Sequence, residues 1–379
     1  MTAARPVFHT KLCHLLDIDY PILQSGMAGV AGPDLAAEVS NAGGLGILAA
    51  VRLTADQLRT GIRQIRAKTT RPFGVNLLLP RDLRPPVPVA DISAQTVAAV
   101  QAALNPMRVA LGLPPTIARP APPSDLIADT FQVILDERVP VFSIGLGNPG
   151  PEMVADCHRR GIKVIAMVTT VEDARAVEAT GVDAVVAQGS EAGGHRSHFE
   201  KPASAELGTI GTAALVPAVV EAVRIPVIAA GGLADGRGLV MALALGASGV
   251  LMGTRFVATR ESMAHEAYKK ALLERSGDTT TLTDAFTGRF ARVLRNAFTE
   301  GYARSGAPTL PFFWQLEAAR DIHQEAATQG NPDYFPLWAG QSVGLLHDLP
   351  SAAEVIERTV QEARVLLLEG LPQAVQLHE

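Results

Sequence analysis

Eight short apolar runs recur along the chain, and segments with apolar residues at helical spacing separate them. Each run is continuously apolar rather than alternating, which is typical of parallel strands that are covered on both faces. Eight strands that alternate with helices predict an α/β protein and favour a (β/α)8 TIM barrel over an open doubly wound sheet, which is kept as the alternative. The runs span residues 21–27, 44–50, 73–79, 141–147, 163–168, 184–189, 226–232 and 249–256.

The segments between the runs contain signals for the start and the end of helices. Thr54 precedes a helical pattern and is followed by Gln57 in a capping-box arrangement, which predicts a helix start. Gly181 and Gly246 follow helical patterns at positions where glycine commonly ends a helix. Residues 238–254 form the longest uncharged stretch, which is shorter than the roughly 20 residues of a membrane span. This stretch therefore predicts a buried helix that runs into a buried strand.

Two segments interrupt the alternation and set the expected domain organisation. Residues 80–124 are rich in proline and follow the third run, so they are predicted to be a surface insertion or a lid over the site. Residues 258–346 lack strand signals and show amphipathic helical spacing, which predicts a mainly helical accessory domain inserted into the barrel. The barrel then comprises residues 1–257 and 347–379, and residues 352–368 are expected to be its closing helix.

The composition excludes several classes of protein. Charged residues make up 19% of the 379 residues and the formal net charge is −5, so neither general disorder nor a nucleic-acid partner is expected. Cys13 and Cys157 form no CxxC pair, which favours a reducing compartment and a cytoplasmic location. His14 and Asp17 interrupt the apolar run near the N-terminus, so neither a signal peptide nor a membrane partner is expected. No motif with metal-ligand spacing is present, and no metal is expected.

Glycine-rich sequence follows the seventh and eighth runs. Gly231 and Gly232 end the seventh run, and Gly253 and Thr254 end the eighth. In TIM barrels the loops after these two strands commonly bind phosphate through bare amides and a helix N-terminus. The sequence therefore predicts a phosphate site here; the alternative is a plain tight turn at each strand end.

A second glycine-rich loop follows the sixth run and carries the candidate catalytic residue. It contains Gln188, Gly193, Gly194 and His195. A histidine on a flexible turn at the C-terminal face of a barrel is suited to proton transfer, because its unperturbed pKa is near neutral pH. His195 is therefore the candidate general base, and His198 is its local competitor.

Several stretches together resemble the nitronate monooxygenase family, formerly called 2-nitropropane dioxygenase. They are PILQSGMAGVAGPDLAAEVSNAGGLGILAA, FGVNLLLP, AVVAQGSEAGGHRS, PVIAAGGLADGRGLVMALALGASGVLMGTRF and GRFARVLRNAF. The resemblance runs from about residue 22 to residue 346 and is weakest over 80–124. AQGSEAGGHRS is its most specific part and resembles the bacterial class whose loop histidine is the catalytic base.

The resemblance implies an FMN-dependent enzyme that converts alkyl nitronates, and neutral nitroalkanes as a second class, with O₂ to a carbonyl compound and nitrite. His195 would take the α-proton of a nitroalkane or orient the nitronate. A homodimer is the candidate assembly. The implied FMN-binding residues are Gly26, Met27, Asn76, Gln188, Gly193, Gly194, Gly231, Gly232, Met252, Gly253 and Thr254.

Related flavin enzymes on the same scaffold give the alternative functions. A flavin-type enoyl-[acyl-carrier-protein] reductase has a similar GGH loop and would use NAD(P)H and a thioester. An NADH:quinone reductase has a stretch like residues 75–80 but is not expected to carry the AGGH loop. An inosine-monophosphate-dehydrogenase-like enzyme needs a cysteine after the sixth strand, and this loop has none. A non-catalytic flavin- or phosphate-binding module is disfavoured by His195 at the strand end.

Overall fold

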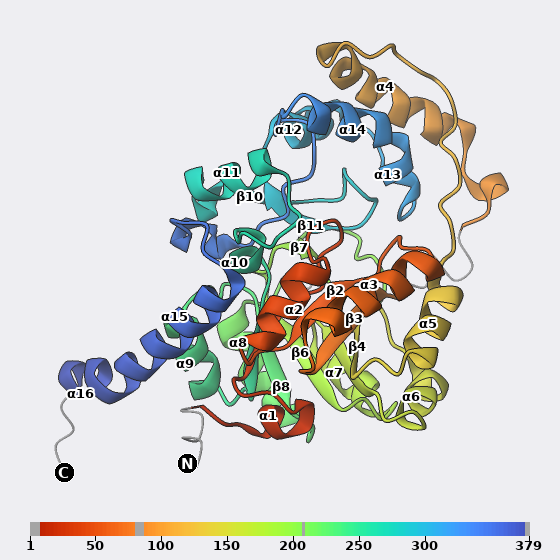
Figure 1. The fold of residues 1–379 in the computed structure, drawn as a ribbon. Helices are drawn as coiled ribbons and strands as arrows, with labels where there is room; N and C mark the ends of the chain where they lie inside the picture. The colour runs from red at the N-terminus through yellow and green to blue at the C-terminus, as the bar shows by residue number, and fades with distance from the viewer. Residues whose placement is uncertain (1–7, 80–86, 207–208, 376–379) are drawn as a thin grey trace.

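Eight parallel strands form the centre of the structure, a computed structural model that describes residues 8–79, 87–206 and 209–375 (Figure 1). Their order is β1-β9-β8-β6-β5-β4-β3-β2, and a parallel bridge between Leu23 and Leu45 joins β1 to β2. Every apolar run of the sequence contains one of these strands, so the TIM barrel is confirmed and the open sheet is excluded. The strands are β1 (Ile22–Gln24), β2 (Gly46–Ala49), β3 (Phe73–Leu78), β4 (Val141–Gly145), β5 (Lys163–Val168), β6 (Ala184–Gln188), β8 (Val227–Ala230) and β9 (Gly249–Met252).

One helix follows each strand and packs on the outside of the barrel. Thr54 caps α3 as predicted: its hydroxyl accepts from the Gln57 amide at 3.3 Å, and the Gln57 side chain accepts from the Thr54 amide at 2.9 Å. Gly181 and Gly246 follow α7 and α9 with φ of 91° and 89°, a conformation that glycine adopts without strain. The helices are α2 (Pro33–Asn41), α3 (Ala55–Lys68), α5 (Ile127–Asp136), α6 (Gly150–His158), α7 (Val171–Glu178), α8 (Thr212–Ala222), α9 (Gly236–Ala244) and α15 (Ala352–Val365).

A short helix covers one end of the barrel, and the helix after the last strand completes the outer layer. Helix α1 (Lys11–Leu16) covers the N-terminal ends of the strands, and its Leu12 and Leu16 pack into the same core cluster as the side chains inside the barrel. On the outside of the barrel, α15 packs against α9 and α2 and continues through η4 (Leu366–Gly370) into α16 (Leu371–Ala374), which projects from the barrel in Figure 1. The predicted closing helix is therefore present, and a ligand site is expected at the C-terminal ends of the strands.

The proline-rich segment and residues 258–346 share a second hydrophobic core above the barrel (Figure 1). Residues 80–86 lie outside the described residues, but the rest of the insertion contains a 17-residue helix, α4, which the sequence did not indicate. Arg108 of α4 is buried, and its Nε donates to the Asp321 carboxylate of α14 at 2.7 Å. The insertion thus packs on the accessory segment. The elements of this region are η1 (Val89–Asp91), α4 (Ala94–Ala110), α10 (Thr254–Val257), α11 (Glu266–Glu274), η2 (Gly277–Thr279), α12 (Ala297–Ser305), α13 (Trp314–Ala318), α14 (Arg320–Thr328) and η3 (Gln341–Leu345).

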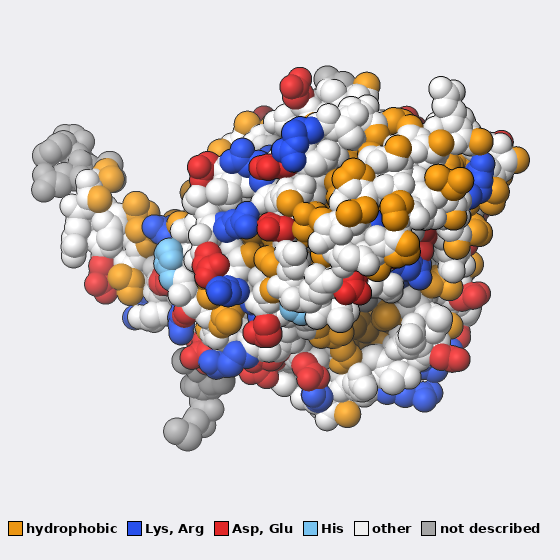
Figure 2. Space-filling view, turned by 90° about the horizontal axis from the view of Figure 1, so that it is seen from above, with side chains coloured by type: hydrophobic (Ala, Val, Ile, Leu, Met, Phe, Trp, Pro, Cys, Tyr) orange, Lys and Arg blue, Asp and Glu red, His pale blue; other side chains and the backbone are white. Residues whose placement is uncertain are grey.

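A small antiparallel sheet joins the accessory segment to the barrel. Strands β10 (Thr280–Thr283) and β11 (Ala291–Leu294) lie in a segment where the sequence showed only helical signals. Strand β11 also pairs with β7 (Gly194–His195), which lies in the loop after β6. The face of the molecule seen from above is hollowed and carries hydrophobic side chains (Figure 2). Among the described residues, no helix is long and apolar enough to cross a membrane.

Candidate active site

The residues implied by the sequence lie at the C-terminal ends of the barrel strands, as expected. A Cβ on Gly193 would lie 2.5 Å from the Gly340 amide nitrogen, which itself donates to the Thr254 hydroxyl at 2.9 Å. A Cβ on Gly231 would lie 3.0 Å from the Ala192 amide nitrogen. The loops after β6, β8 and β9 are therefore in direct contact, and each close approach requires glycine.

The ends of β1 and β3 meet on the other side of the barrel mouth. A Cβ on Gly26 would lie 2.4 Å from the Cβ of Asn76, whose side-chain amide donates to the Ser143 carbonyl at 3.2 Å. The sulfur of Met27 lies 3.7 Å from the place a Cβ on Gly253 would take, which links this group to the end of β9. The side chain of Met252 is buried in the core outside the barrel and does not join the group.

The glycine turns after β8 and β9 fit a phosphate group. Gly231 and Gly232 have φ of 105° and 73°, and their backbone amides, like those of Gly253 and Thr254, make no hydrogen bond to any other described residue. The Thr254 hydroxyl accepts from the Gly340 amide, so its own hydrogen remains to be donated. Bare amides and a hydroxyl at adjacent strand ends are the donors that a phosphate requires.

The N-terminus of α9 is not available to this phosphate. Asp235 accepts hydrogen bonds there from the amides of Arg237 and Gly238, at 3.0 Å and 3.2 Å. The Gly236 amide donates to the Glu362 carboxylate of α15 at 2.9 Å. A phosphate at this end of the barrel would therefore be restricted to the turns themselves and to the start of α10.

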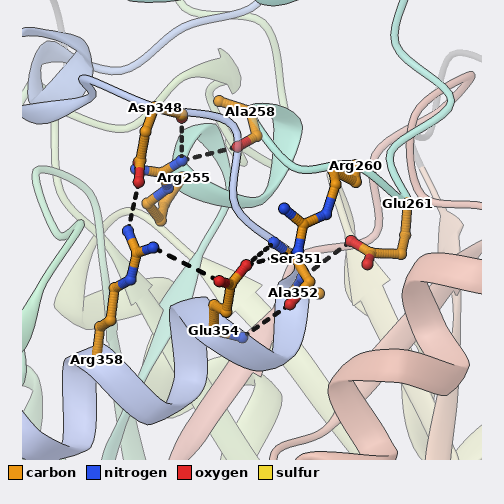
Figure 3. Close-up of polar contacts among 9 residues, drawn as sticks. All are labelled: Arg255, Ala258, Arg260, Glu261, Asp348, Ser351, Ala352, Glu354 and Arg358. Atoms are coloured by element: carbon orange, nitrogen blue, oxygen red, sulfur yellow. Dashed lines mark hydrogen bonds and ion pairs between the residues drawn. The ribbon is translucent and has the colours of Figure 1, made fainter.

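A polar network holds the start of α10 against the chain that returns to α15 (Figure 3). The guanidinium of Arg255, only 7% exposed, donates to the Ala258 carbonyl at 2.7 Å and to the Asp348 carbonyl at 2.9 Å, and pairs with the Asp348 carboxylate at 3.3 Å. Asp348 also pairs with Arg358 of α15. Because Arg255 follows Thr254 directly, this network fixes the turn that carries the proposed phosphate donors.

Replacing Asp348 with Ala is expected to lower the free energy of unfolding by about 1–2 kcal/mol, because buried Arg255 loses its carboxylate partner. Urea denaturation measures this change. The matched control is Arg260→Gln, which removes an exposed ion pair to Glu354 in the same network and should cost less than about 0.5 kcal/mol. Equal losses in the two variants would contradict the special role of the Arg255 contact.

The backbone around His195 is pinned, which corrects the expectation of a flexible turn. His195 pairs with Ala291 of β11, and the next amide, of Arg196, donates to the Phe290 carbonyl at 2.9 Å. The Gln188 side chain donates to the His195 carbonyl and accepts from the Ser197 amide, both at 2.9 Å. Gln188 thus holds the loop and retains one N–H for a ligand.

The imidazole of His195 lies among residues of the accessory segment. Its Nε2 is 2.8 Å from the Thr287 hydroxyl, while its Nδ1 makes no hydrogen bond to another described residue. The ring centroid lies 5.4 Å from that of Phe312, in an edge contact, and 5.1 Å from that of Trp338. Two aromatic rings and one hydroxyl therefore set the orientation of the imidazole, and Nδ1 is the nitrogen left without a partner among the described residues.

Burial lowers the pKa of His195 from its ordinary 6.5 to about 4, and the positive charge of Arg289 acts in the same direction. His195 is consequently neutral at physiological pH, as a proton acceptor must be. The pKa of His198 is also lowered to about 4 by burial and by Arg196 and Arg289, and its Nδ1 lies 2.8 Å from the Thr169 hydroxyl, much as Nε2 of His195 lies by Thr287. The His198 side chain is buried, however, whereas that of His195 is partly exposed and so open to a ligand. His195 thus remains the better candidate for the base.

The stability of the protein is expected to fall in acid. His195, His198 and His323 have folded-state pKa values lowered to about 4, mainly by burial. Between pH 6.5 and 4 the unfolded chain binds protons that the folded chain does not, so the free energy of unfolding decreases as the pH falls through this window. Urea denaturation at pH 7.5, 6 and 5 tests this. His323→Gln should make the dependence shallower, and an unchanged dependence would contradict the assignment.

Three arginines surround the loop after β6. Arg196 is buried, and its guanidinium donates to the carbonyls of Gly189 and Gln188 at 2.6 Å and 2.9 Å. Arg292 of β11 donates to the Ser190 carbonyl at 2.9 Å, and Arg289 donates to the His198 carbonyl at 2.9 Å. The nearby carboxylate of Glu191 offsets part of the positive charge of Arg196 and Arg292. Within the described ranges, no group of three or more His, Cys, Asp and Glu is arranged to hold a metal ion.

The sequence did not indicate Thr287 and Phe312 as site residues, and it left open whether Trp338 contributes to the substrate pocket or only to the core. All three lie more than 90 positions beyond His195 in the chain, and only the fold brings them to it. A signal for one of them was present, since Thr287 directly precedes the stretch GRFARVLRNAF that contributed to the family resemblance.

Comparisons with known proteins identify the family of the chain. A family model described as nitronate monooxygenase matches residues 9–362. A probable nitronate monooxygenase of Staphylococcus saprophyticus is 38% identical over 94% of this chain and 98% of its own, and one of Staphylococcus haemolyticus is 36% identical over 95% and 98%.

Two solved structures are also similar. The nitroalkane oxidase of Streptomyces ansochromogenes superposes with a TM-score of 0.84 at 36% identity and covers 94% of this chain and 99% of its own. FabK of Thermotoga maritima superposes with a TM-score of 0.75 at 35% identity and covers 97% and 100%. Because the family model and both relatives extend over nearly the whole chain, the chain belongs to the nitronate monooxygenase family, a family of oxidoreductases.

Proposed function

We propose that the protein uses FMN and O₂ to convert alkyl nitronates, and more slowly neutral nitroalkanes, to a carbonyl compound and nitrite. The observation that carries this proposal is the placement of His195: a neutral imidazole with an unengaged Nδ1, in the barrel mouth that also holds the bare amides after β8 and β9. A base beside a phosphate-binding barrel mouth suits a flavin enzyme that must first remove a proton from carbon.

The residues of the mouth divide into two groups around the proposed cofactor. Gly231, Gly232, Gly253 and Thr254 would hold the phosphate of FMN through their amides and the threonine hydroxyl. The other implied residues, Gly26, Met27, Asn76, Gln188, Gly193 and Gly194, would lie near the ring, whereas Met252 contributes only its backbone. FMN, when bound, supplies the redox chemistry that passes electrons from the nitronate to O₂.

The protein residues would act on the substrate as follows. Nδ1 of His195 takes the α-proton of a nitroalkane, and the charge left on the substrate is delocalised onto the nitro oxygens as a nitronate. Thr287 holds Nε2 at 2.8 Å during this transfer and keeps the ring in place. The positive charge of Arg289, which acts on His195, would stabilise the developing anion. A nitronate arrives already ionised and needs only this charge and the ordered imidazole.

The test is an oxygen-electrode assay with purified protein that shows a flavin absorption spectrum. Propyl nitronate should consume O₂ and release nitrite without NAD(P)H. A protein that stays colourless when FMN is added would overturn the flavin assignment. Absence of O₂ uptake by a flavin-loaded protein would overturn the monooxygenase assignment alone.

The similarity to FabK keeps one alternative open, a flavin-dependent NAD(P)H reductase on the same scaffold. The two functions differ in what reduces the flavin. Under anaerobic conditions NADH should leave the flavin absorption unchanged, while propyl nitronate should alter it. Rapid bleaching by NADH, with no response to nitronate, would favour the reductase.

A further inference from the structure

A cavity of about 490 Å³ lies beside the C-terminal ends of β2 and β3. Its volume falls within the range of small-molecule binding sites. Most of its wall is apolar: Val51 follows β2, Leu77 and Leu78 end β3, Ile127 begins α5 and Phe313 precedes α13. Within the described residues its lining includes none of those proposed to hold the flavin, so the cavity lies beside the proposed flavin site at the same end of the barrel.

One side of this cavity is charged. The carboxylate of Glu317, only 8% exposed, pairs with Arg52 at 3.4 Å and also with Arg320. Two guanidinium groups on one carboxylate leave this side with a net positive charge. The other carboxylate in the lining, Asp125, accepts a hydrogen bond from the Ile127 amide at 3.2 Å. Asp125 is not among the charges that act on Arg52, so an anionic group beside Arg52 and Arg320 would complete the neutralisation of this pair.

The backbone at two wall residues is held in an unfavourable conformation. Arg52 has φ of 71° and Phe313 has φ of 65°, in the left-handed region that bulky residues rarely occupy. Both side chains line the cavity, so the strained backbone directs a guanidinium and an aromatic ring toward it. Strain of this kind is concentrated at binding and catalytic sites.

Phe313 also connects the cavity to the candidate base. Its ring stacks on that of Phe312 with centroids 4.1 Å apart, and Phe312 contacts the His195 ring. The Phe313 amide donates to the carbonyl of Thr287 at 3.0 Å, and the Thr287 hydroxyl binds His195. Phe313 is therefore connected to the imidazole in two ways, through the ring of Phe312 and through Thr287. A ligand that displaces Phe313 is separated from the imidazole by a single residue along each connection.

We propose that this cavity binds an aliphatic chain that ends in an anionic group. The chain would pack on the apolar wall between Val51, Leu78 and Phe313, and the anionic end would lie at Arg52 and Arg320. Each additional methylene buried on this wall should tighten binding roughly fourfold, so chain length should decide affinity. Two kinds of ligand have these properties: the distal part of the substrate itself, and a separate carboxylic acid.

Isothermal titration of the flavin-loaded protein with decanoate tests the binding site without turnover. Decanoate should bind, and Val51→Trp, which fills the cavity, should weaken binding at least tenfold. Ala121→Trp, on an exposed part of the lining, is the second filling variant in case Val51→Trp does not fold. If the unmodified protein does not bind decanoate supplied at roughly 1 mM, or if the filling variants bind it equally well, the proposal is overturned.

The charged end has its own test. Arg52→Gln should weaken decanoate binding about tenfold and leave decanol binding unchanged, because only the carboxylate uses the guanidinium. The matched control is Arg66→Gln, since Arg66 pairs with Glu137 outside the cavity and should affect neither ligand. Equal loss for decanoate and decanol in Arg52→Gln would contradict an anion site.

Steady-state kinetics distinguish a cavity that takes the distal part of the substrate from one that takes a separate acid. Of the experiments on the cavity, only this one rests on the proposed function. If the cavity takes the distal part of the substrate, decanoate raises the KM of decyl nitronate and leaves ethyl nitronate unaffected. If it takes a separate acid, decanoate changes kcat for ethyl nitronate, and Phe313→Leu removes that change. Decanoate binding without an effect on either substrate would overturn the link to His195, whereas binding by a protein inactive on all nitronates would refute only the proposed function.

Discussion

Replacing His195 with Asn is expected to reduce kcat/KM for neutral nitroalkanes by about 10²–10⁴-fold, the usual contribution of a positioned general base. Asparagine keeps a polar group near Thr287 but cannot take a proton. Activity on preformed nitronates should change by less than about tenfold, because these substrates arrive ionised. Steady-state assays with nitroethane and with ethyl nitronate measure the two effects in the same preparation.

The control is His198→Asn, on the same loop and with a pKa that burial also lowers to about 4. His198 is bound to Thr169, so its replacement should affect the two substrates equally. An equal loss on nitroalkane and nitronate in His195→Asn would contradict the assignment of His195 as the base. A selective loss in His198→Asn would transfer that role to His198.

Gly253→Ala is expected to weaken FMN binding by roughly 10–100-fold, about 1.4–2.8 kcal/mol. The φ of Gly253 is −106°, and a Cβ there would meet no protein atom closer than the Met27 sulfur at 3.7 Å. The protein itself should therefore accept alanine, and its melting temperature without flavin should change by less than about 2 °C. The added methyl group would occupy space that the phosphate needs.

Gly344→Ala is the matched control, because it also adds a methyl group in ordinary contact, 3.5 Å from the nearest atom, but outside the barrel mouth. It should leave the dissociation constant of FMN, measured by fluorescence of the free flavin, unchanged. Normal flavin affinity in Gly253→Ala would show that the phosphate lies elsewhere. A large loss of stability without flavin would instead indicate a packing defect.

The barrel could be predicted from the sequence because its signals are local. A parallel strand covered on both faces must be apolar throughout, so each of the eight strands appears as a short uninterrupted run. The glycine turns after β8 and β9 were visible for the same reason, since bare amides with positive φ require glycine at Gly231 and Gly232. Because His195 follows the end of a strand in the sequence, it was also predicted to lie in the barrel mouth.

The small sheet and the helix of the insertion could not be read in the same way. Strands β10 and β11 are short and β10 is only partly buried, so neither forms an apolar run. They are held by each other and by β7, which lies about 90 residues earlier in the chain. Helix α4 has a weakly amphipathic sequence with an internal proline, Pro106, and packs on the accessory segment through buried Arg108.

The sequence by itself therefore determined the barrel, the position of the phosphate turns and the identity of the candidate base, because each depends on residue type at a strand end. Only the tertiary structure decided what surrounds that base. Thr287, Phe312 and Trp338 reach His195 because β11 pairs with β7 and carries the accessory segment over the barrel mouth. The reactive nitrogen and the lowered pKa of His195 depend on these contacts and on the burial they produce, which residue spacing along the chain does not encode.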